Sequence, residues 1–158
     1  NQKIISFSIG KFAFLIDKPF YIRSKGGNKF VIDTSGHQNG GGNIKIYQKS
    51  NDMHVNQTWT VDKEGHLINW QNRNSILYLD HIGNSERPRF IGRNDSAQKT
   101  NSPNAKWRLN DCGQIESLAC QSLVLDVSSN WYANNTPVIT FRKNGGANQR
   151  WDCIVLRK

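Results

Sequence analysis

Asn148-Gln149-Arg150-Trp151 closes the last of three related segments in this 158-residue chain. The other two end in Asn56-Gln57-Thr58-Trp59 and, less faithfully, in Asn104-Ala105-Lys106-Trp107. An apolar run that finishes on an aspartate precedes each ending, and these runs are Phe30-Val31-Ile32-Asp33, Leu77-Tyr78-Leu79-Asp80 and Leu123-Val124-Leu125-Asp126. Aspartate and tryptophan lie 26 (59−33), 27 (107−80) and 25 (151−126) residues apart, while successive aspartates lie 47 (80−33) and 46 (126−80) apart. Two landmarks in register over three copies indicate an internal repeat.

Each landmark has a physical role to play. A tryptophan is a large apolar body with one N–H to satisfy, so three of them suit a shared core built one third at a time. The glutamine two residues earlier can both donate to and accept from a neighbouring loop. The aspartate offers two acceptor oxygens at the end of a strand, where hydroxyl groups of a ligand could reach them.

These three copies, with strands such as Leu123-Val-Leu-Asp126 and Gln-x-Trp endings, resemble the ricin B-chain lectin family. The resemblance covers roughly Lys18 to Leu156 and is strongest in the third copy. It implies an all-β chain folded as a β-trefoil with three pseudo-symmetric repeats, at approximately 18–62, 63–110 and 111–158. Residues 1–17 would form an N-terminal lead-in strand before this single domain.

Composition agrees with one all-β domain. The strand-forming runs are short, and no stretch of helical length keeps an uninterrupted period of 3.6 residues. The glycine pair in Ser24-Lys-Gly-Gly-Asn28 suits the positive φ angles of a tight hairpin. A formal charge of +9 and a pI near 9.7 favour anionic partners. Because Lys and Arg are spread along the chain without a recognition helix, acidic or sulfated glycans fit this charge better than nucleic acid does.

The first copy is predicted to bind a sugar. A sugar has an apolar C–H face and an edge of hydroxyls, so its pocket needs an aromatic plate beside a donor and an acceptor. By resemblance to the family's sugar site, Asp33 accepts two hydroxyls, Tyr47 is the stacking plate, Asn56 bonds the same edge and Gln57 steadies Asp33 from behind. Lys45 stands where a neutral residue is usual, which argues against a simple preference for neutral galactose.

The third copy offers a complete second set. By the same resemblance, Asp126 is the acceptor, Phe141 the plate and Asn148 the amide, with Gln149 behind the carboxylate and Ile139 at the position of Lys45. The implied partners are glycans or glycoproteins of the galactose or N-acetylgalactosamine type.

The second copy is predicted to be structural. It keeps Asp80 and Asn104 but has Ala105 in place of the glutamine. Its third strand, 89–92, occupies the place of 45–48, so that Ile91 or Gly92 stands where Tyr47 stands in the first copy. No aromatic plate remains.

The sequence lacks the motifs of other functional classes. The four histidines are dispersed without metal-ligand spacing, and no nucleophile elbow, phosphate loop or cofactor motif is present, which predicts no enzyme, no metal site and no cofactor. The aspartates can also cap turns and the aromatic residues can be ordinary core or rim residues. The alternative class is a basic trefoil that binds acidic glycans or a protein partner without a hexose pocket.

The chain has three cysteines. Cys112, Cys120 and Cys153 allow at most one intramolecular disulfide. On the trefoil path Cys120 and Cys153 are the expected pair and Cys112 stays free, the alternative being three reduced thiols. The chain begins at Asn1 without a methionine, as a mature or trimmed form would, and carries three Asn-x-Ser/Thr sequons, which together favour a secreted or cell-surface protein.

Overall fold

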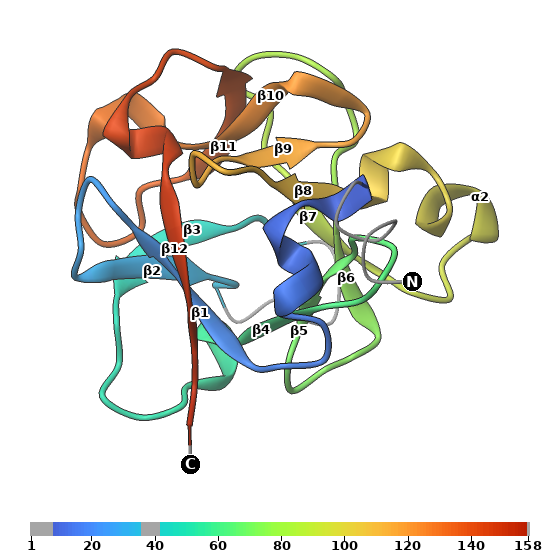
Figure 1. The fold of residues 1–158 in the computed structure, drawn as a ribbon, viewed down its shortest axis with the longest axis horizontal. Coiled ribbons are helices and arrows are strands. Elements are labelled where there is room, and N and C mark those ends of the chain that lie inside the picture. The colour runs from blue at the N-terminus through green and yellow to red at the C-terminus, as the bar shows by residue number, and fades with distance from the viewer. Residues whose placement is uncertain (1–7, 36–41, 158) are drawn as a thin grey trace.

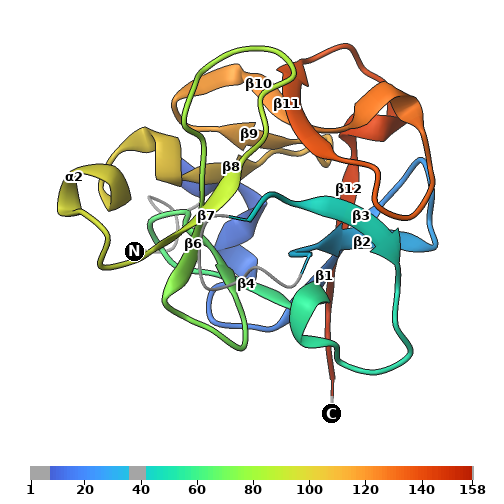
Figure 2. The same ribbon diagram turned by 180° about the vertical axis from the view of Figure 1, so that it is seen from behind.

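The computed structural model describes residues 8–35 and 42–157, which contain twelve short strands, four in each repeat (Figures 1 and 2). The strands are β1 (Phe20–Ser24), β2 (Phe30–Asp33), β3 (Lys45–Gln48) and β4 (Trp59–Val61); β5 (Leu67–Asn69), β6 (Ser75–Tyr78), β7 (Arg89–Gly92) and β8 (Trp107–Leu109); β9 (Ile115–Ser117), β10 (Cys120–Val127), β11 (Val138–Arg142) and β12 (Trp151–Val155). The short helices are η1 (Lys11–Phe14), η2 (Val55–Gln57), α2 (Ala97–Thr100), η3 (Pro103–Ala105), η4 (Ser128–Asn130) and η5 (Ala147–Gln149).

The strands pair in the same way in each repeat. The second and third strands form antiparallel hairpins, β2–β3, β6–β7 and β10–β11. The first and fourth strands pair within the first repeat through β1–β4 and join the repeats to one another through β1–β12, β4–β5 and β8–β9. Single hydrogen bonds of 2.8 Å from Trp107 N to Gly65 O and from Trp151 N to Gly113 O close the ring. A six-stranded barrel capped by three hairpins is a β-trefoil, as the repeats predicted.

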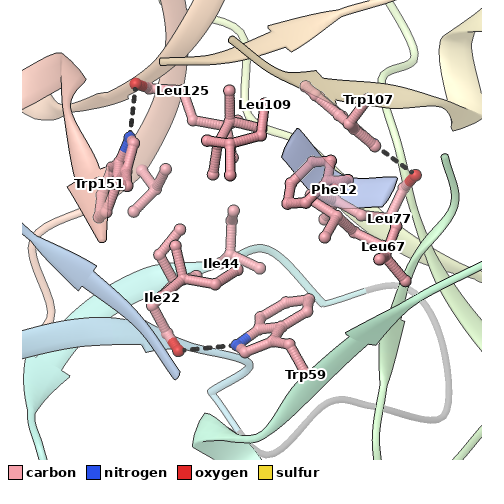
Figure 3. Packing of buried hydrophobic residues seen from close by; sticks show 14 of the residues in the cluster. Phe12, Ile22, Ile44, Trp59, Leu67, Leu77, Trp107, Leu109, Leu125 and Trp151 are labelled. Carbon is pink, nitrogen blue, oxygen red and sulfur yellow. Dashed lines mark hydrogen bonds between the residues drawn. The ribbon is translucent and has the colours of Figure 1, made fainter. Parts of the chain in front are cut away.

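The three tryptophans build the core from three sides (Figure 3). Trp59, Trp107 and Trp151 are at most 2% exposed and belong to one apolar cluster. Their indole N–H groups donate to the carbonyl oxygens of Ile32, Leu77 and Leu125, at 3.0, 3.2 and 3.1 Å. Each tryptophan therefore fastens the hairpin of its own repeat to the core, because its only polar atom has a partner on the hairpin's first strand.

The N-terminal segment differs from the expected lead-in strand. Residues 11–14 form the 3₁₀ helix η1, and residues 1–7 lie outside the described residues. Phe12 of η1 is fully buried in the core, while Phe14 is 62% exposed. Gly10, with φ of 64°, lets the backbone pass against Leu109, where a Cβ atom would fall 2.0 Å from the carbonyl oxygen. In the described part of this segment, residues 8–17, the chain packs on the barrel as a helical turn and forms no strand.

The glycine pair of the first hairpin serves a different purpose from the expected one. Among the described glycines with positive φ, neither Gly26 nor Gly27 appears. A Cβ atom on either would lie within 2.5 Å of the ring or hydroxyl of Tyr132. The glycines make room for an aromatic side chain that arrives from the third repeat, so the constraint is steric contact and not backbone conformation.

The expected disulfide is absent from the structure, in which all three cysteines are free. Cys120 lies opposite Ser117 in one sheet, with its Sγ 3.2 Å from Ser122 Oγ. Cys153 lies opposite Ile22 in the other sheet. The prediction placed Cys120 and Cys153 side by side, whereas the strands that carry them belong to different sheets. No helix within residues 8–35 and 42–157 is long and apolar enough to cross a membrane.

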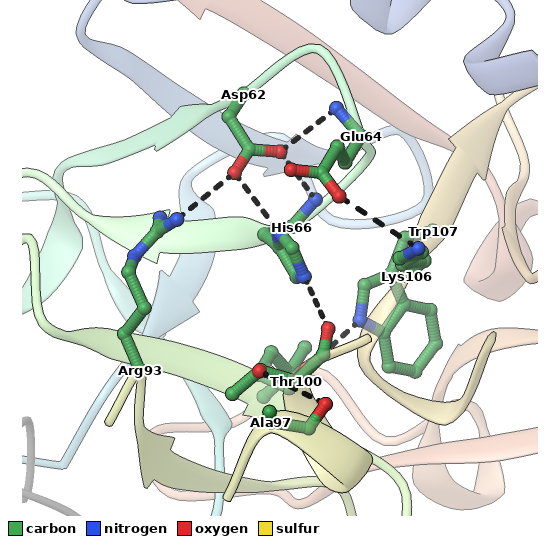
Figure 4. Close-up of polar contacts among 9 residues, drawn as sticks. Asp62, Glu64, His66, Arg93, Ala97, Thr100, Lys106 and Trp107 are labelled. Carbon is green, nitrogen blue, oxygen red and sulfur yellow. Dashed lines mark hydrogen bonds and ion pairs between the residues drawn. The ribbon is translucent and has the colours of Figure 1, made fainter. Parts of the chain in front are cut away.

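A polar cluster fastens the second repeat's longest connection to the barrel (Figure 4). His66 lies just before β5 and is 3% exposed. Its Nδ1 is 2.8 Å from Asp62 Oδ2, and its Nε2 is 2.7 Å from the carbonyl oxygen of Thr100, the last residue of α2. Arg93 Nη1 also donates to Asp62 Oδ2, at 3.2 Å. Both ring nitrogens face oxygen acceptors, an arrangement that suits a protonated imidazolium.

The third repeat builds the same turn with an amide in place of the aspartate, and this amide also donates to Glu116 Oε2 at 2.9 Å. Asp62 Oδ1 accepts from the backbone N–H of Glu64 and His66, as Asn110 Oδ1 accepts from the N–H groups of Cys112 and Gln114. The Asn110 amide then donates to Gln114 Oε1 at 2.9 Å, where the second repeat has its aspartate and histidine. Asp62, Glu64 and His66 bring three potential ligand atoms within 4.8 Å of one another, but the ring nitrogens of His66 already have protein partners.

Candidate functional site

The strand registers align the three hairpins residue by residue. The partners are Asp33–Lys45 and Val31–Tyr47 in β2–β3, Tyr78–Arg89 and Ile76–Ile91 in β6–β7, and Asp126–Ile139 and Val124–Phe141 in β10–β11. The indole bonds agree, because Ile32, Leu77 and Leu125 each stand directly before the aligned position. The second-repeat counterpart of Asp33 and Asp126 is therefore Tyr78. The equivalence predicted for Asp80 is wrong by two residues, whereas Ile91 does stand at the position of Tyr47.

In the first repeat, the predicted residues surround one cavity of about 510 Å³ between β2, β3 and η2. Asp33, 5% exposed, lies at its floor, and Tyr47, 37% exposed, stands on the next strand. Lys45 and Asn56 complete the predicted wall. The hairpin register and the 3₁₀ turn together bring a carboxylate, an aromatic ring and an amide to a single hollow, as the first-copy prediction required.

Gln57 holds this cavity together from behind. Its Nε2 donates to Asp33 Oδ2 at 3.2 Å and to Gln48 O at 2.9 Å, while its Oε1 accepts from Ser50 N at 2.8 Å. The other oxygen of Asp33 accepts from Ser35 N at 2.7 Å. The carboxylate is thereby fixed in orientation, with lone pairs left over because an ionised carboxylate has about four acceptor positions.

The third repeat encloses a second cavity of about 570 Å³ between β10, β11 and η5. Asp126, 3% exposed, forms the floor, with Ile139, Phe141 and Asn148 around it. Gln149 is buried and repeats the role of Gln57, donating to Asp126 Oδ2 at 2.9 Å and to Arg142 O at 2.9 Å. All five predicted residues of the third copy are thus brought together.

Burial sets the ionisation of the third-repeat carboxylate. It raises the pKa of Asp126 above the ordinary value for aspartate, and hydrogen bonds from Gln149 and Asn148 oppose this effect only in part. The Asn148 amide also donates to Val127 O at 3.2 Å, which anchors η5 on the strand that carries Asp126. The geometry offers a desolvated acceptor beside an aromatic ring.

The described residues of the second repeat do not assemble a comparable set. Ile91 and Ala105, the counterparts of Tyr47 and Gln57, pack with Ile68 and Ile76, and Tyr78 packs against them in the place of the aspartate. Asp80 is exposed and is held by Arg89, whose Nη2 donates to Asp80 Oδ1 at 2.9 Å. Asn104 keeps its place by donating to Leu79 O at 2.7 Å. The structural role predicted for the second copy agrees with this packing.

Several wall residues lay outside the sequence prediction. The first cavity is also lined by Ser35, Lys49 and His54, and the third by Asn144 and by Ser128 to Asn130 of η4. Their common signal is position, because each lies two to four residues from a predicted residue near a strand or helix end. Ser85 lines the third cavity from the second repeat and had no local signal at all.

Comparison with known proteins places this geometry in context. The sequence profile of the ricin-type beta-trefoil lectin domain matches residues 18–151. A search of curated proteins found no match. Among solved structures, the chain is similar to the designed three-fold symmetric protein ThreeFoil, with 21% identity, 89% of this chain and 100% of that chain covered, and a TM-score of 0.76.

Two natural lectins solved with sugars are also similar. The earthworm R-type lectin C-half, in complex with GalNAc, shares 23% identity over 88% of this chain and 99% of its own, with a TM-score of 0.69. The Macrolepiota procera ricin B-like lectin, in complex with lactose, shares 19% identity over 89% of this chain and 97% of its own, also with a TM-score of 0.69. At these identities the likeness shows the fold, and the profile match over residues 18–151 shows that the chain belongs to the ricin-type β-trefoil lectin family.

Proposed function

We propose that the chain binds glycans of the galactose or N-acetylgalactosamine type through two shallow sites, one in the first repeat and one in the third. The observation that carries the proposal is the paired construction of the two cavities. In each, a buried aspartate is fixed by a buried glutamine and faces an aromatic side chain on the neighbouring strand. A hexose presents hydroxyls on one edge and C–H groups on one face, which this pairing of acceptor and ring suits.

The proposal is for binding without catalysis. Asp33 and Asp126 belong to separate cavities in different repeats, so they do not form the paired acid and base that glycoside hydrolysis uses. A protein of this function works where glycans are displayed, so the proposal includes a secreted or cell-surface location.

The test uses three aspartate variants of the whole chain. Asp33→Ala and Asp126→Ala each remove one proposed acceptor, while Asp80→Ala removes the exposed aspartate of the second repeat, where no site is proposed. Titration with galactose, N-acetylgalactosamine and lactose, followed by amide NMR shifts, reports each hairpin separately. We expect each of the first two changes to abolish shifts on its own hairpin, since a hydrogen bond to an ionised acceptor contributes about 1.5–3 kcal/mol.

Asp80→Ala should leave both sets of shifts intact. The proposal is refuted if the double variant Asp33→Ala/Asp126→Ala, still folded, binds these sugars as tightly as the parent does.

A further inference from the structure

The two cavities differ in charge, and the difference lies at one aligned position. Lys45 of β3 occupies the place that Ile139 occupies in β11. Lys49 also lines the first cavity, whereas the described lining of the third has no lysine or arginine. The first cavity therefore holds two ammonium groups and one carboxylate, and the third holds one carboxylate.

Both ammonium groups are held at the cavity by neutral partners. Lys45 Nζ donates to Asn135 Oδ1 at 2.5 Å and lies 5.0 Å from the centre of the Tyr47 ring. Lys49 Nζ donates to Ser50 O at 3.1 Å and lies 4.7 Å from the centre of the Tyr21 ring. Amide, carbonyl and ring contacts orient the lysines but leave their charge uncompensated.

Several other lysines have a carboxylate partner at close range. Lys143 Nζ lies 2.7 Å from Glu116 and Lys25 Nζ lies 3.6 Å from Asp152. Among the residues that the structure describes, no carboxylate lies within 4.0 Å of the ammonium of Lys45 or Lys49. Two uncompensated cations at the wall of a cavity with a hydroxyl-accepting floor call for an anionic group on the ligand.

Resting on the function proposed above, we infer that the first-repeat site selects sugars that carry an anionic substituent, a sulfate or a carboxylate, while the third-repeat site takes neutral sugars. The hydroxyl edge of the sugar meets Asp33 and its face meets Tyr47. The ammonium of Lys45, beside the same ring, then contacts the anionic substituent. The ammonium of Lys49, which directly follows β3, contacts the same substituent. At the third site the lone charge of Asp126 repels such a ligand.

The test compares three related ligands: methyl galactoside, its 6-sulfate and methyl galacturonide. Amide NMR titration gives one affinity from β2–β3 and another from β10–β11. We expect the two anionic ligands to bind the first site about two- to twentyfold more tightly than the neutral one, a preference that weakens with added salt because exposed charges are screened. The sulfate and carboxylate arms distinguish which anion fits.

Variants locate the preference. Lys45→Ile copies the aligned residue of the third repeat, and Lys49→Gln removes the second charge. Each should lower the ratio of anionic to neutral affinity at the first site about two- to fivefold. Lys63→Gln, at an exposed turn outside both cavities, changes the net charge equally and should leave the ratio unchanged.

The outcomes separate the two proposals. If methyl galactoside shifts both hairpins but the first site shows no anionic preference, the inference fails and the proposed function stands. If methyl galactoside shifts the third-repeat hairpin and the first site binds nothing, the inference fails together with the first-repeat half of the proposed function. An equal effect of Lys63→Gln and Lys45→Ile also overturns the inference, since net charge would then explain it. If no ligand shifts either hairpin, both proposals fail.

Discussion

Replacing Asp62 with asparagine tests how the second repeat holds its long connection. The change keeps the Oδ1 acceptor that the backbone N–H groups of Glu64 and His66 use, as Asn110 shows in the third repeat. It removes the negative charge that lies 2.8 Å from His66 Nδ1 and 3.2 Å from Arg93. The other charges nearby, Glu64 and Lys106, face each other at 3.9 Å and are untouched.

The expected loss of stability follows from the ionisation of Asp62 and His66. Burial works against the charge on Asp62, but hydrogen bonds and charge from His66, with Arg93 beyond, lower the pKa of Asp62 to about 2. Against an ordinary aspartate this difference corresponds to about 2.5 kcal/mol. The carboxylate is partly exposed, so solvent screening reduces the expected loss of unfolding free energy to about 1–2 kcal/mol, or roughly 2–8 °C in Tm.

The pH dependence has a definite sign. Although burial opposes it, contacts with Asp62 and Thr100 raise the pKa of His66, so its stabilisation is complete below about pH 6.5 and is lost as pH rises through the raised value. The lowered pKa of Asp62 gives stabilisation that is present above about pH 4 and is lost as pH falls towards 2. The difference between parent and variant is therefore largest between about pH 4 and 6.5.

Urea unfolding at pH 5.5 and pH 8.5 measures this difference. The control is Asp62→Asn/His66→Gln, which transplants the neutral pair of Asn110 and Gln114. We expect Asp62→Asn to cost more at pH 5.5 than at pH 8.5, and the control to lose the pH dependence. Equal losses at the two pH values would refute the reasoning, as would a control that is as pH-dependent as the parent.

Three further predictions concern the third repeat and the thiols. Gln149→Ala removes three hydrogen bonds of a buried side chain, with Asp126 Oδ2, Arg142 O and Asn144 N. It should lower the free energy of unfolding in urea by about 2–4 kcal/mol, whereas exposed Gln121→Ala should lower it by under about 0.5 kcal/mol. Asp126→Asn should abolish the amide shifts that sugars cause on β10–β11. It should also raise Tm at pH 7 by up to about 4 °C, because the raised pKa of Asp126 marks a charge that burial disfavours. A fall in Tm of that size would contradict this reasoning. Thiol counting on unreduced, denatured protein should find three free thiols, and in the folded protein Cys153 should react far more slowly than exposed Cys112, because burial raises the pKa of the Cys153 thiol.

The repeat pattern predicted the trefoil and the hairpins of the first and third repeats, but it misaligned the hairpin of the second repeat. Asp80 follows an apolar run just as Asp33 does, and a shift of two residues along a strand leaves every side chain on the same face. Alternation of polar and apolar residues could not reveal the error. The spacing to the tryptophan also concealed the error. The true counterpart, Tyr78, lies 29 residues before Trp107 (107−78), further than Asp33 and Asp126 lie from their tryptophans, because the second repeat has additional residues that accommodate α2. Only the strand register, which is a tertiary property, separates the two alignments.

Contacts between repeats were beyond the reach of the pattern. Lys45 finds Asn135 across 90 residues of sequence, and Tyr132 packs on Gly26 from a distant loop. His66 showed no periodicity that would link it to Thr100, 34 residues away. A repeat motif predicts what each copy does internally, because spacing is conserved within a copy. It does not predict contacts between copies, such as the one that orients Lys45, or contacts across a long loop within a copy, such as the one that anchors α2.

The second repeat also answers why the buried carboxylates exist. Tyr78, Ile91 and Ala105 replace aspartate, aromatic ring and glutamine there, and the hairpin still pairs and packs. The fold therefore has no need of a carboxylate at this position. In the third repeat Asp126 is kept in an environment that raises its pKa, a cost to stability that an apolar residue would avoid. A costly group that the architecture can omit is expected where it serves binding, and this argument supports the proposal that Asp126 and Asp33 are the acceptors of the two proposed sites.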